Sequence, residues 1–350
     1  MSVAMTSHAM MFLGSIPSPP FQDLTVGPLS FRMYGLMIAL GVIAAVWIGR
    51  RRFASYGGDP EDITTIALVA VPAGLVGARL YHVVTDWSER YSGGRWWPDA
   101  FQIWHGGLGI PGGVLLGVIA GVIAARLMKI DWRLAADAVA PAIPVAQAIG
   151  RLGNWFNQEL YGRETDLPWG LRIDVEPGRT FHPTFLYELL WNLALAACIA
   201  FASGRIVLKR GRWFAVYVFG YGLGRLWVEA LRSDFATKLF GVRVNIWTAL
   251  VAIVGGLAWL FWRGSPVDGE ATERLRAGTT MAEIIGGEGV RPPLAADTAS
   301  AAPPENEDVL AEQPVVADEP VVTDEPVVTD DLVLSDEAAG DEAGEDPSVS

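Results

Sequence analysis

The sequence predicts an all-α integral membrane protein with about seven transmembrane helices, a small extracytoplasmic head segment and a disordered cytoplasmic tail. Of its 350 residues, 51% are apolar and only 19% are charged, whereas soluble domains carry about 25% charged residues. Seven apolar runs also approach the roughly 20 residues that a helix needs to cross a bilayer. They are Met33–Gly49, Ile63–Val84, Leu108–Leu127, Leu134–Ile149, Phe185–Ala202, Trp213–Leu231 and Ile246–Trp262.

The fourth run is the least regular, because Asp137, Pro141 and Pro144 interrupt it. The connection that follows, residues 150–183, is too polar to cross a membrane and is rich in turn-forming residues, so we expect it to form the head segment. The three expected regions are therefore an N-terminal extracytoplasmic segment (1–28), a transmembrane catalytic domain (29–263) and the tail (264–350).

The net charge of −13 combines two unlike pieces of chain. From Ser265 onward there are 22 Asp and Glu against three Arg, a balance of −19, while the preceding residues hold 23 Lys and Arg against 17 Asp and Glu, a balance of +6. The C-terminal part is poor in aromatic residues and repeats the pattern PVVADE, PVVTDE, PVVTDD from Pro314 to Asp331. Such a composition predicts disorder. If the tail is only a solvated appendage, cutting after Trp262 or Arg263 should leave activity intact.

Basic residues in the short loops indicate the orientation. They recur in alternate connections, at Arg50–Arg52, at Arg126, Lys129 and Arg133, at Arg205, Lys209, Arg210 and Arg212, and at Arg263. Because basic loops face the cytoplasm, the N-terminus is expected outside and the acidic tail inside. The first 28 residues show no cleavable signal peptide.

The stretch IGRLGNWFNQELYG (Ile149–Gly162) crowds hydrogen-bonding side chains and aromatic rings at the expected outer face. In the sixth run, Tyr221, Arg225, Glu229 and Arg232 recur at helical spacing and share one face. Charged residues within spans are costly and point to function. Since arginine forks match phosphate oxygens, these groups predict a site for an anionic phospholipid.

Three other stretches carry polar groups or glycines near the expected outer side: GARLYHV (Gly77–Val83), WHGGLGIPGG (Trp104–Gly113) and FHPTFLYE (Phe181–Glu188). Arg79 fits either this site or simple extension to the interface, and the glycine pairs fit either ligand approach or helix packing. No Cys/His spacing points to a metal, no cofactor or nucleic acid is expected, and Cys198 is expected to be a packing residue.

These blocks, in this order, closely resemble the prolipoprotein diacylglyceryl transferase family over residues Leu29 to Trp262. GRLGNWFNQELYG (Gly150–Gly162) carries most of the likeness, and FRMYGL, GARLYHV, WHGGLGIPGG, HPTFLYE and YGLGRLWVEALR accompany it. The resemblance implies a seven-span enzyme of the bacterial inner membrane, with phosphatidylglycerol and the lipobox cysteine of prolipoprotein signal peptides as substrates. The expected products are a thioether-linked prolipoprotein and glycerol 1-phosphate.

The resemblance also implies roles for individual residues. Arg151 and Arg225 match the family's essential arginines, which are expected to bind the phosphate, with Asn154, Glu159 and Glu188 orienting them. The remaining matches are Tyr34, Tyr221 and Gly162, expected at the phosphatidylglycerol site.

The sequence departs from the family pattern at the position of a candidate base. Some members carry His before the second Gly-Gly of the glycine-rich block, where this chain has Pro111, and His105 lies six residues earlier. Either the base lies elsewhere, or the cationic site ionises the thiol without one.

Two other classes compete with a transferase. A phospholipid or anion transporter would bind the headgroup without chemistry, but no internal repeat of the transporter kind is evident. An intramembrane protease needs Ser/His or paired Asp residues within spans, and Ser is nearly absent from the apolar runs.

Overall fold

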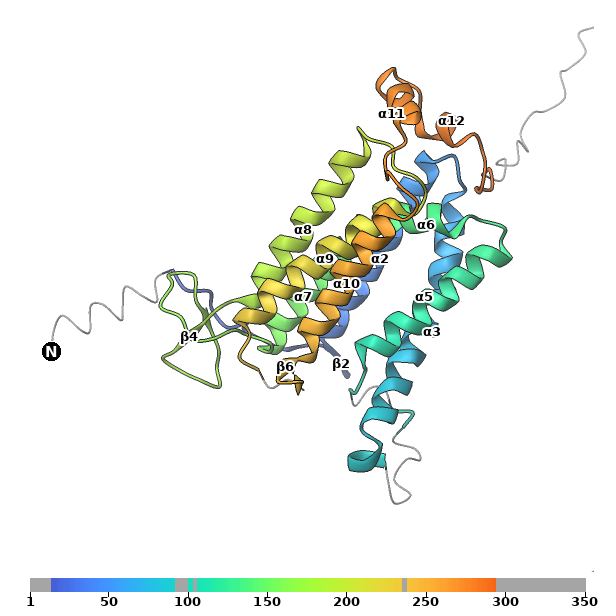
Figure 1. Cartoon of the computed structure of the whole chain (residues 1–350). Coiled ribbons are helices and arrows are strands. Elements are labelled where there is room, and N and C mark those ends of the chain that lie inside the picture. Colours follow the sequence, from blue (N-terminus) through green and yellow to red (C-terminus); the bar gives the residue numbers. More distant parts are fainter. Residues whose placement is uncertain (1–13, 92–99, 103–105, 235–237, 294–350) are drawn as a thin grey trace, which may run out of the picture. The chain divides into compact units, whose positions relative to one another are not determined.

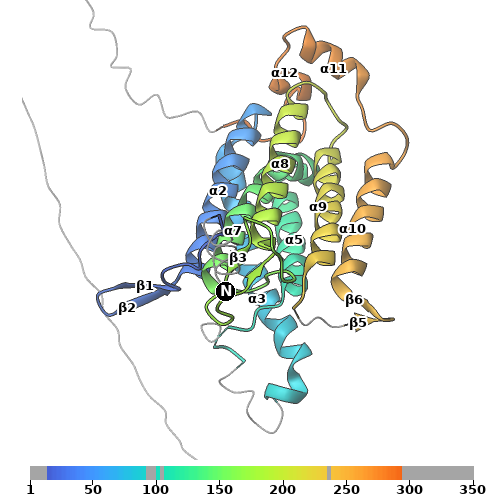
Figure 2. The same cartoon turned by 90° about the vertical axis from the view of Figure 1, so that its left-hand side faces the viewer.

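The computed structural model describes residues 14–91, 100–102, 106–234 and 238–293, and most of its regular elements are helices (Figures 1 and 2). Single helices cover six of the seven predicted runs. They are α2 (Met33–Ser55), α3 (Pro60–Thr85), α5 (Ile110–Leu127), α8 (Thr184–Ser203), α9 (Arg212–Leu231) and α10 (Val244–Phe261). Within the described part of the chain, five of these, all except α9, are long and apolar enough to cross a membrane. The chain is a helical, multi-pass membrane protein.

The fourth predicted run is not a single helix. It is divided between α6 (Trp132–Val139) and α7 (Ala142–Asn157). Pro141 lies between them, and proline ends a helix because it lacks an N–H donor and its ring clashes with the preceding turn. Helix α7 in turn extends eight residues past the predicted end at Ile149. Arg151 and Asn154 therefore lie on a helix, and the predicted head segment begins only after Asn157.

Each long helix packs on the next in the series α5, α3, α2, α7, α8, α9, α10. Small residues allow the closest approaches. A side chain at Gly77 of α3 would lie 2.3 Å from the carbonyl oxygen of Gly112 in α5, and one at Gly222 of α9 would lie 2.9 Å from that of Ala249 in α10. Such contacts bring backbones together where no hydrophobic effect drives helix association. Gly112, in the glycine-rich block, therefore serves helix packing.

In the part of the chain that the structure describes, three short antiparallel hairpins lie at helix ends. They are β1 (Asp23–Val26) with β2 (Leu29–Arg32), β3 (Leu171–Arg172) with β4 (Thr180–Phe181), and β5 (Lys238–Leu239) with β6 (Val242–Arg243). A π-helical turn, η1 (Trp87–Tyr91), follows α3. Residues 158–183 form the head segment around β3 and β4, with a small core of Leu171, Ile173, Phe181 and Phe185. This core fixes the head segment at the end of α7 and the beginning of α8.

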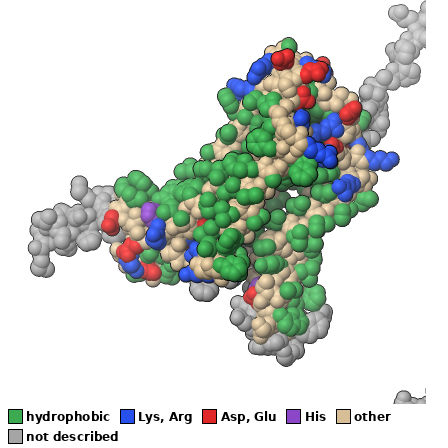
Figure 3. All heavy atoms as spheres, viewed as in Figure 1, with side chains coloured by type: hydrophobic (Ala, Val, Ile, Leu, Met, Phe, Trp, Pro, Cys, Tyr) green, Lys and Arg blue, Asp and Glu red, His purple; other side chains and the backbone are tan. Residues whose placement is uncertain are grey.

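Hydrophobic side chains cover the flanks of the helices, whereas charged side chains gather near α11 and α12 and near β4 (Figure 3). Leu68 of α3 is 70% exposed, and Val251 of α10 is also 70% exposed. Exposed apolar area of this extent marks a surface that another apolar phase covers. That phase is the lipid of the bilayer.

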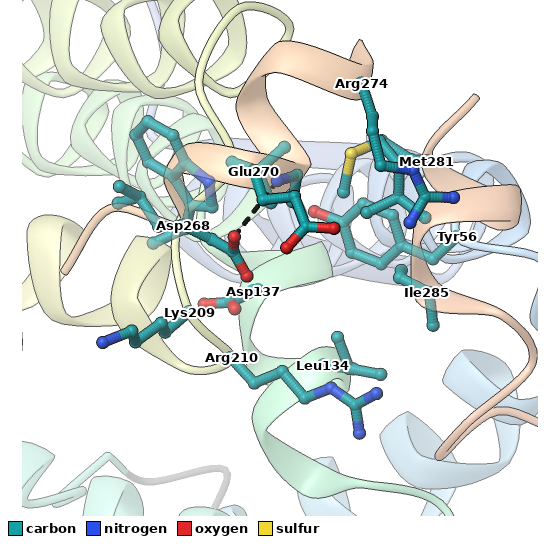
Figure 4. A pocket seen from close by; sticks show the side chains of 15 residues that line it. Tyr56, Leu134, Asp137, Lys209, Arg210, Asp268, Glu270, Arg274, Met281 and Ile285 are labelled. Atoms are coloured by element: carbon teal, nitrogen blue, oxygen red, sulfur yellow. Dashed lines mark hydrogen bonds between the residues drawn. The ribbon is translucent and has the colours of Figure 1, made fainter. Parts of the chain in front are cut away.

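The prediction of disorder from residue 264 onward does not hold for residues 264–293. This stretch contains α11 (Gly269–Arg276) and α12 (Met281–Ile285). The side chains of α12 pack on the cluster of Phe53, Tyr56 and Leu134, and a cavity of about 280 Å³ remains among α6, α11, α12 and the loop before α9 (Figure 4). The acidic repeat beyond residue 293 lies outside the described residues.

Polar contacts hold this C-terminal stretch to the first turn of α3 and to two loops. Asp62, fully buried, pairs with Arg291, the N–H of Asp131 donates to the carbonyl of Gly289, and the N–H of Val207 donates to Thr272 Oγ1 at 3.0 Å. Composition did not reveal these contacts, because they depend on a few residues within an otherwise polar segment. We call residues 264–293 the C-terminal clasp.

Two truncations distinguish the clasp from the acidic repeat. A chain ending at residue 293 should unfold at the temperature of the full chain. A chain ending at Arg263 leaves the buried Asp62 carboxylate without its partner, which costs roughly 1–3 kcal/mol and lowers Tm by several degrees. Thermal unfolding in one detergent measures both. Equal Tm values for the two truncations would show that the clasp contributes nothing.

Candidate active site

The carboxylate of Glu188 joins two arginines from different helices. Glu188 lies in the second turn of α8, and one of its oxygens pairs with Arg151 Nη2 of α7. The other oxygen accepts a hydrogen bond of 3.1 Å from Arg225 Nη1 of α9. The Glu188 side chain is only 8% exposed, against 20% for Arg151 and 12% for Arg225. The sequence predicted these three residues at one site, and the structure brings them together.

Close packing of α8 on α9 sets this geometry. A side chain at Gly224 would lie 2.2 Å from the indole nitrogen of Trp191, and one at Gly220 would collide with Leu195. The Trp191 indole donates to the carbonyl of Gly220 at 3.0 Å. The glycines of the sixth predicted run therefore bring Arg225 within reach of α8, which is how a repeated small residue favours helix contact.

The end of α7 orients Arg151. Arg151 Nη1 donates to Asn154 Oδ1 at 3.1 Å, and the amide nitrogen of Asn154 donates to Glu159 Oε1 at 2.9 Å. The chain reverses just after the helix because Gln158 adopts a left-handed conformation with φ of 53°. Asn157 also reaches Glu159, at 3.4 Å. Residues 151–159 thus form a chain of hydrogen bonds from Arg151 Nη1 through Asn154 to Glu159, and this chain fixes the orientation of the Arg151 guanidinium.

A second buried carboxylate, Glu229, holds the other side of Arg225. Glu229 is 1% exposed, and its oxygens lie 2.9 Å from Arg225 Nη2, 2.6 Å from Arg243 Nε and 3.1 Å from Asn245 Nδ2. Arg243 and Asn245 escaped the sequence analysis. The available signal was a basic residue just before the last apolar run, at the end of the chain segment that follows Glu229 of the sixth.

The loop after α9 completes the network. Asp234 accepts hydrogen bonds from Arg232 at 2.7 and 2.9 Å and from Arg243 Nη2 at 3.2 Å. Burial by itself would raise the pKa of Asp234, but the hydrogen bond and charge of Arg232 and the charge of Arg243 outweigh it, so the pKa is lowered. Burial likewise opposes the charge on Arg232, but Asp234 and the more distant carboxylates raise its pKa. Both groups are therefore ionised at neutral pH.

The other predicted site residues have different surroundings. Tyr34 packs against Gly153 of α7, and its hydroxyl lies in the electrostatic field of Arg151 and Glu159. Tyr221 packs beside Tyr217, with ring centroids 6.2 Å apart, one turn before Arg225. Gly162 lies where any side chain would collide with His182 and the carbonyl of Leu231. Gly162 therefore serves close backbone packing between the head segment and the end of α9.

The polar residues of the second predicted run have other partners within the described part of the chain. Arg79 is buried, and its guanidinium donates to the carbonyls of Ala100, Gly106 and Gly107. It holds the loop before α5. His82 Nδ1 lies 3.3 Å from a carboxylate oxygen of Asp86. Pro111 lies in the first turn of α5, and His105 lies outside the described residues.

The network leaves donors for an anion. A guanidinium carries five N–H groups, and Asn154, Glu188 and Glu229 engage only part of those on Arg151 and Arg225. Both arginines also remain slightly exposed, whereas the two carboxylates that hold them are nearly or fully buried. Preorganised cations with free donors suit a phosphate, and they stabilise charge that develops on it.

Comparison with known proteins decides the family. The family model for prolipoprotein diacylglyceryl transferase matches residues 23–262. The chain belongs to the prolipoprotein diacylglyceryl transferase family. It is a transferase, and the matched region ends just before the C-terminal clasp.

Curated relatives carry the same description. The phosphatidylglycerol–prolipoprotein diacylglyceryl transferase of Streptomyces griseus is 48% identical over 253 residues, which cover 71% of this chain and 78% of the relative. That of Bifidobacterium adolescentis is 46% identical over 267 residues, with 71% and 79% coverage. A Streptomyces coelicolor enzyme, named transferase 1, is 50% identical over 244 residues, with 69% and 71% coverage.

Replacement of Glu188 tests whether it holds the two arginines of the transferase together. Glu188→Gln keeps the size of the side chain but leaves Arg151 and Arg225 facing each other without their shared counter-charge. Breaking a buried ion pair on one side costs about 3 kcal/mol, so Tm in detergent should fall clearly. Glu164→Gln is the matched control, because Glu164 pairs with Arg179 at a side-chain exposure of 50%. Equal Tm values for both variants would contradict the bridging role.

Proposed function

We propose that this chain transfers the diacylglyceryl group of phosphatidylglycerol to the cysteine thiol in the lipobox of a prolipoprotein. The pair of arginines held by one buried carboxylate supports this function most directly. A phosphodiester carries an anionic phosphate, and Arg151 and Arg225 present forked donors to it. The family membership supplies the two substrates by name.

In the proposed reaction, the thiolate sulfur attacks the glyceryl carbon that bears the phosphate. The new bond is a thioether S–C bond, the broken bond is the C–O bond to phosphate, and glycerol 1-phosphate departs with the electron pair. The thiol proton leaves before or during the attack and ends on the departing glycerol 1-phosphate or in water, which balances the step. Negative charge grows on the departing oxygens, so guanidinium groups fixed at that position stabilise the transition state more than the ground state.

The same cations assist the nucleophile. A thiol near positive charge has a lowered pKa, and the thiolate is the reactive form. Holding lipid and peptide together adds a proximity advantage. In this proposal Arg151 is oriented by Asn154, Glu159 and Glu188. Arg225 is oriented by Glu188 and Glu229. Tyr34 and Tyr221 lie beside the lipid site. The product gains two acyl chains, which suffice for a stable anchor.

We further propose seven membrane spans, with α6 and α7 together forming the fourth and α9 the sixth. The combined range of α6 and α7, Trp132 to Asn157, is long enough to cross a bilayer at a rise of about 1.5 Å per residue. Helix α9 carries the charged residues Arg225 and Glu229. Because these pair with each other at 2.9 Å, we propose that α9 can still cross the membrane. The N-terminus and the head segment would then be extracytoplasmic and the C-terminal clasp cytoplasmic, in a bacterial inner membrane.

Single cysteines test this orientation in a Cys198→Ala background. Val175→Cys places a thiol on the head segment, where Val175 is 75% exposed, and Glu270→Cys places one on α11. A membrane-impermeant maleimide should label the first in intact cells whose outer barrier has been removed, and the second only after lysis. The reverse pattern would invert the topology.

The reaction itself is tested with purified protein, phosphatidylglycerol and a lipobox peptide, following the peptide mass. The wild type should add one diacylglyceryl mass. Arg151→Lys and Arg225→Lys keep the charge but lose the fork, so each should reduce turnover about 100-fold or more. Arg179→Lys, in the exposed head segment, is the matched control and should retain turnover.

Two results would contradict the proposal. One is unchanged turnover in both site variants, which would place the phosphate elsewhere. The other is absence of any mass gain while the protein still binds or moves phosphatidylglycerol, which would favour a binding or transport function.

A further inference from the structure

A groove rich in arginine lies at the end of α9 opposite Arg225. It has a volume of about 520 Å³ and lies among the beginnings of α6 and α9 and the end of α10. Four arginines line it, Arg133, Arg210, Arg212 and Arg263, and among the described residues no carboxylate does. Arg212 precedes Arg225 by 13 residues on the same helix, which corresponds to about 20 Å. The groove is therefore distinct from the candidate active site.

The guanidinium of Arg212 in the groove has N–H donors without a hydrogen-bond acceptor among the described residues. The residue is only 8% exposed, and its Nη2 donates to the carbonyl oxygen of Trp262. Its Nε and Nη1 are buried and have no hydrogen-bond partner among the described residues. A buried cation with unsatisfied donors is costly. An anion in the groove would supply the missing acceptors.

The other arginines leave the groove positive. Arg133 is exposed, with its guanidinium 5.6 Å from the ring centroid of Trp132, and Arg263 is exposed in the turn after α10. Arg210 is partly engaged, since it lies 3.2 Å from Asp131 and 3.3 Å from Glu288. Arg133, Arg212 and Arg263 therefore face the groove without a carboxylate partner among the described residues, whereas Arg210 is shared with Asp131 and Glu288.

Aromatic rings identify the environment of this groove. Trp132, Trp259 and Trp262 line it, and the first two lie with ring centroids 6.1 Å apart. Trp262 is 63% exposed at the end of the apolar helix α10, and Phe261 beside it is 57% exposed. Tryptophan gathers at the membrane–water interface, and basic pockets between helices at that depth bind lipid headgroups.

We propose that this groove binds the phosphate-bearing headgroup of an anionic phospholipid, as a second lipid site separate from the site of transfer. Arg212 and Arg133 would bind the phosphate oxygens, and the tryptophans would contact the glycerol and upper acyl region. The lipid would join α6, α9 and α10 on the side where the C-terminal clasp lies. Its occupant is bound and not consumed.

The test is a titration of the full-length protein in detergent, read by native mass spectrometry. Dioctanoyl phosphatidylserine is the anionic probe, dioctanoyl phosphatidylcholine the zwitterionic one, and inorganic phosphate the lipid-free one. Wild type should bind phosphatidylserine about tenfold more tightly than phosphatidylcholine, because both carry the phosphate but only phosphatidylserine has a net negative charge for the arginines to attract. A double variant, Arg133→Gln with Arg263→Gln, should weaken phosphatidylserine binding about tenfold.

Controls separate the groove from general charge and from the active site. Arg126→Gln with Lys129→Gln removes the same charge from exposed residues at the same end of the helices, and should change binding by less than about twofold. Arg212→Gln should show the largest loss, but Arg212 also holds the carbonyl of Trp262, so its folding must be checked by Tm. The exposed double variant keeps the test valid in either case.

Three results would overturn the proposal. Equal phosphatidylserine affinity in the groove variant and its charge-matched control would show that the groove does not bind the lipid. Loss of binding in Arg225→Lys with none in the groove variant would assign the lipid to the active site. Displacement of the lipid by equimolar inorganic phosphate would make this a site for free phosphate.

Discussion

The bridge from one buried carboxylate to two arginines organises the structure around it. Glu188 is nearly inaccessible, and Arg151 and Arg225 flank its carboxylate. An isolated charge at this depth would be very costly. Each arginine in turn lies on a different helix, α7 or α9, so α7, α8 and α9 must pack in one relative position. The glycines of α9 and the hydrogen bonds at the end of α7 are arranged to permit that position.

The same constraint explains why the site is both charged and rigid. Arg225 is held from two sides, by Glu188 and Glu229, and Glu229 is held in turn by Arg243 and Asn245. Every carboxylate in this chain of contacts has at least one cationic or amide partner. Preorganisation of this kind lets a cation stabilise developing charge without rearranging during the reaction. It also leaves the remaining N–H groups of the arginines as the place for the phosphate.

Local sequence patterns predicted the apolar helices and the charged face of α9, because both depend on periodicity within one segment. The meeting of Arg151, Glu188 and Arg225 was expected from family resemblance, since their spacing in sequence gives no distance in space. Arg243 was missed because its buried partner Glu229 lies on the preceding helix. The clasp was missed because Asp62 and Arg291, 229 residues apart, look unremarkable alone. The division of the fourth predicted run into α6 and α7 could have been predicted from Pro141, because proline ends helices.

The most direct measurement is a structure of the protein with phosphatidylglycerol bound and no acceptor peptide present. The account predicts the lipid phosphate within hydrogen-bond distance of both Arg151 and Arg225, with Glu188 still between the two guanidinium groups. A phosphate bound away from either arginine, or a Glu188 carboxylate displaced from both, would contradict it.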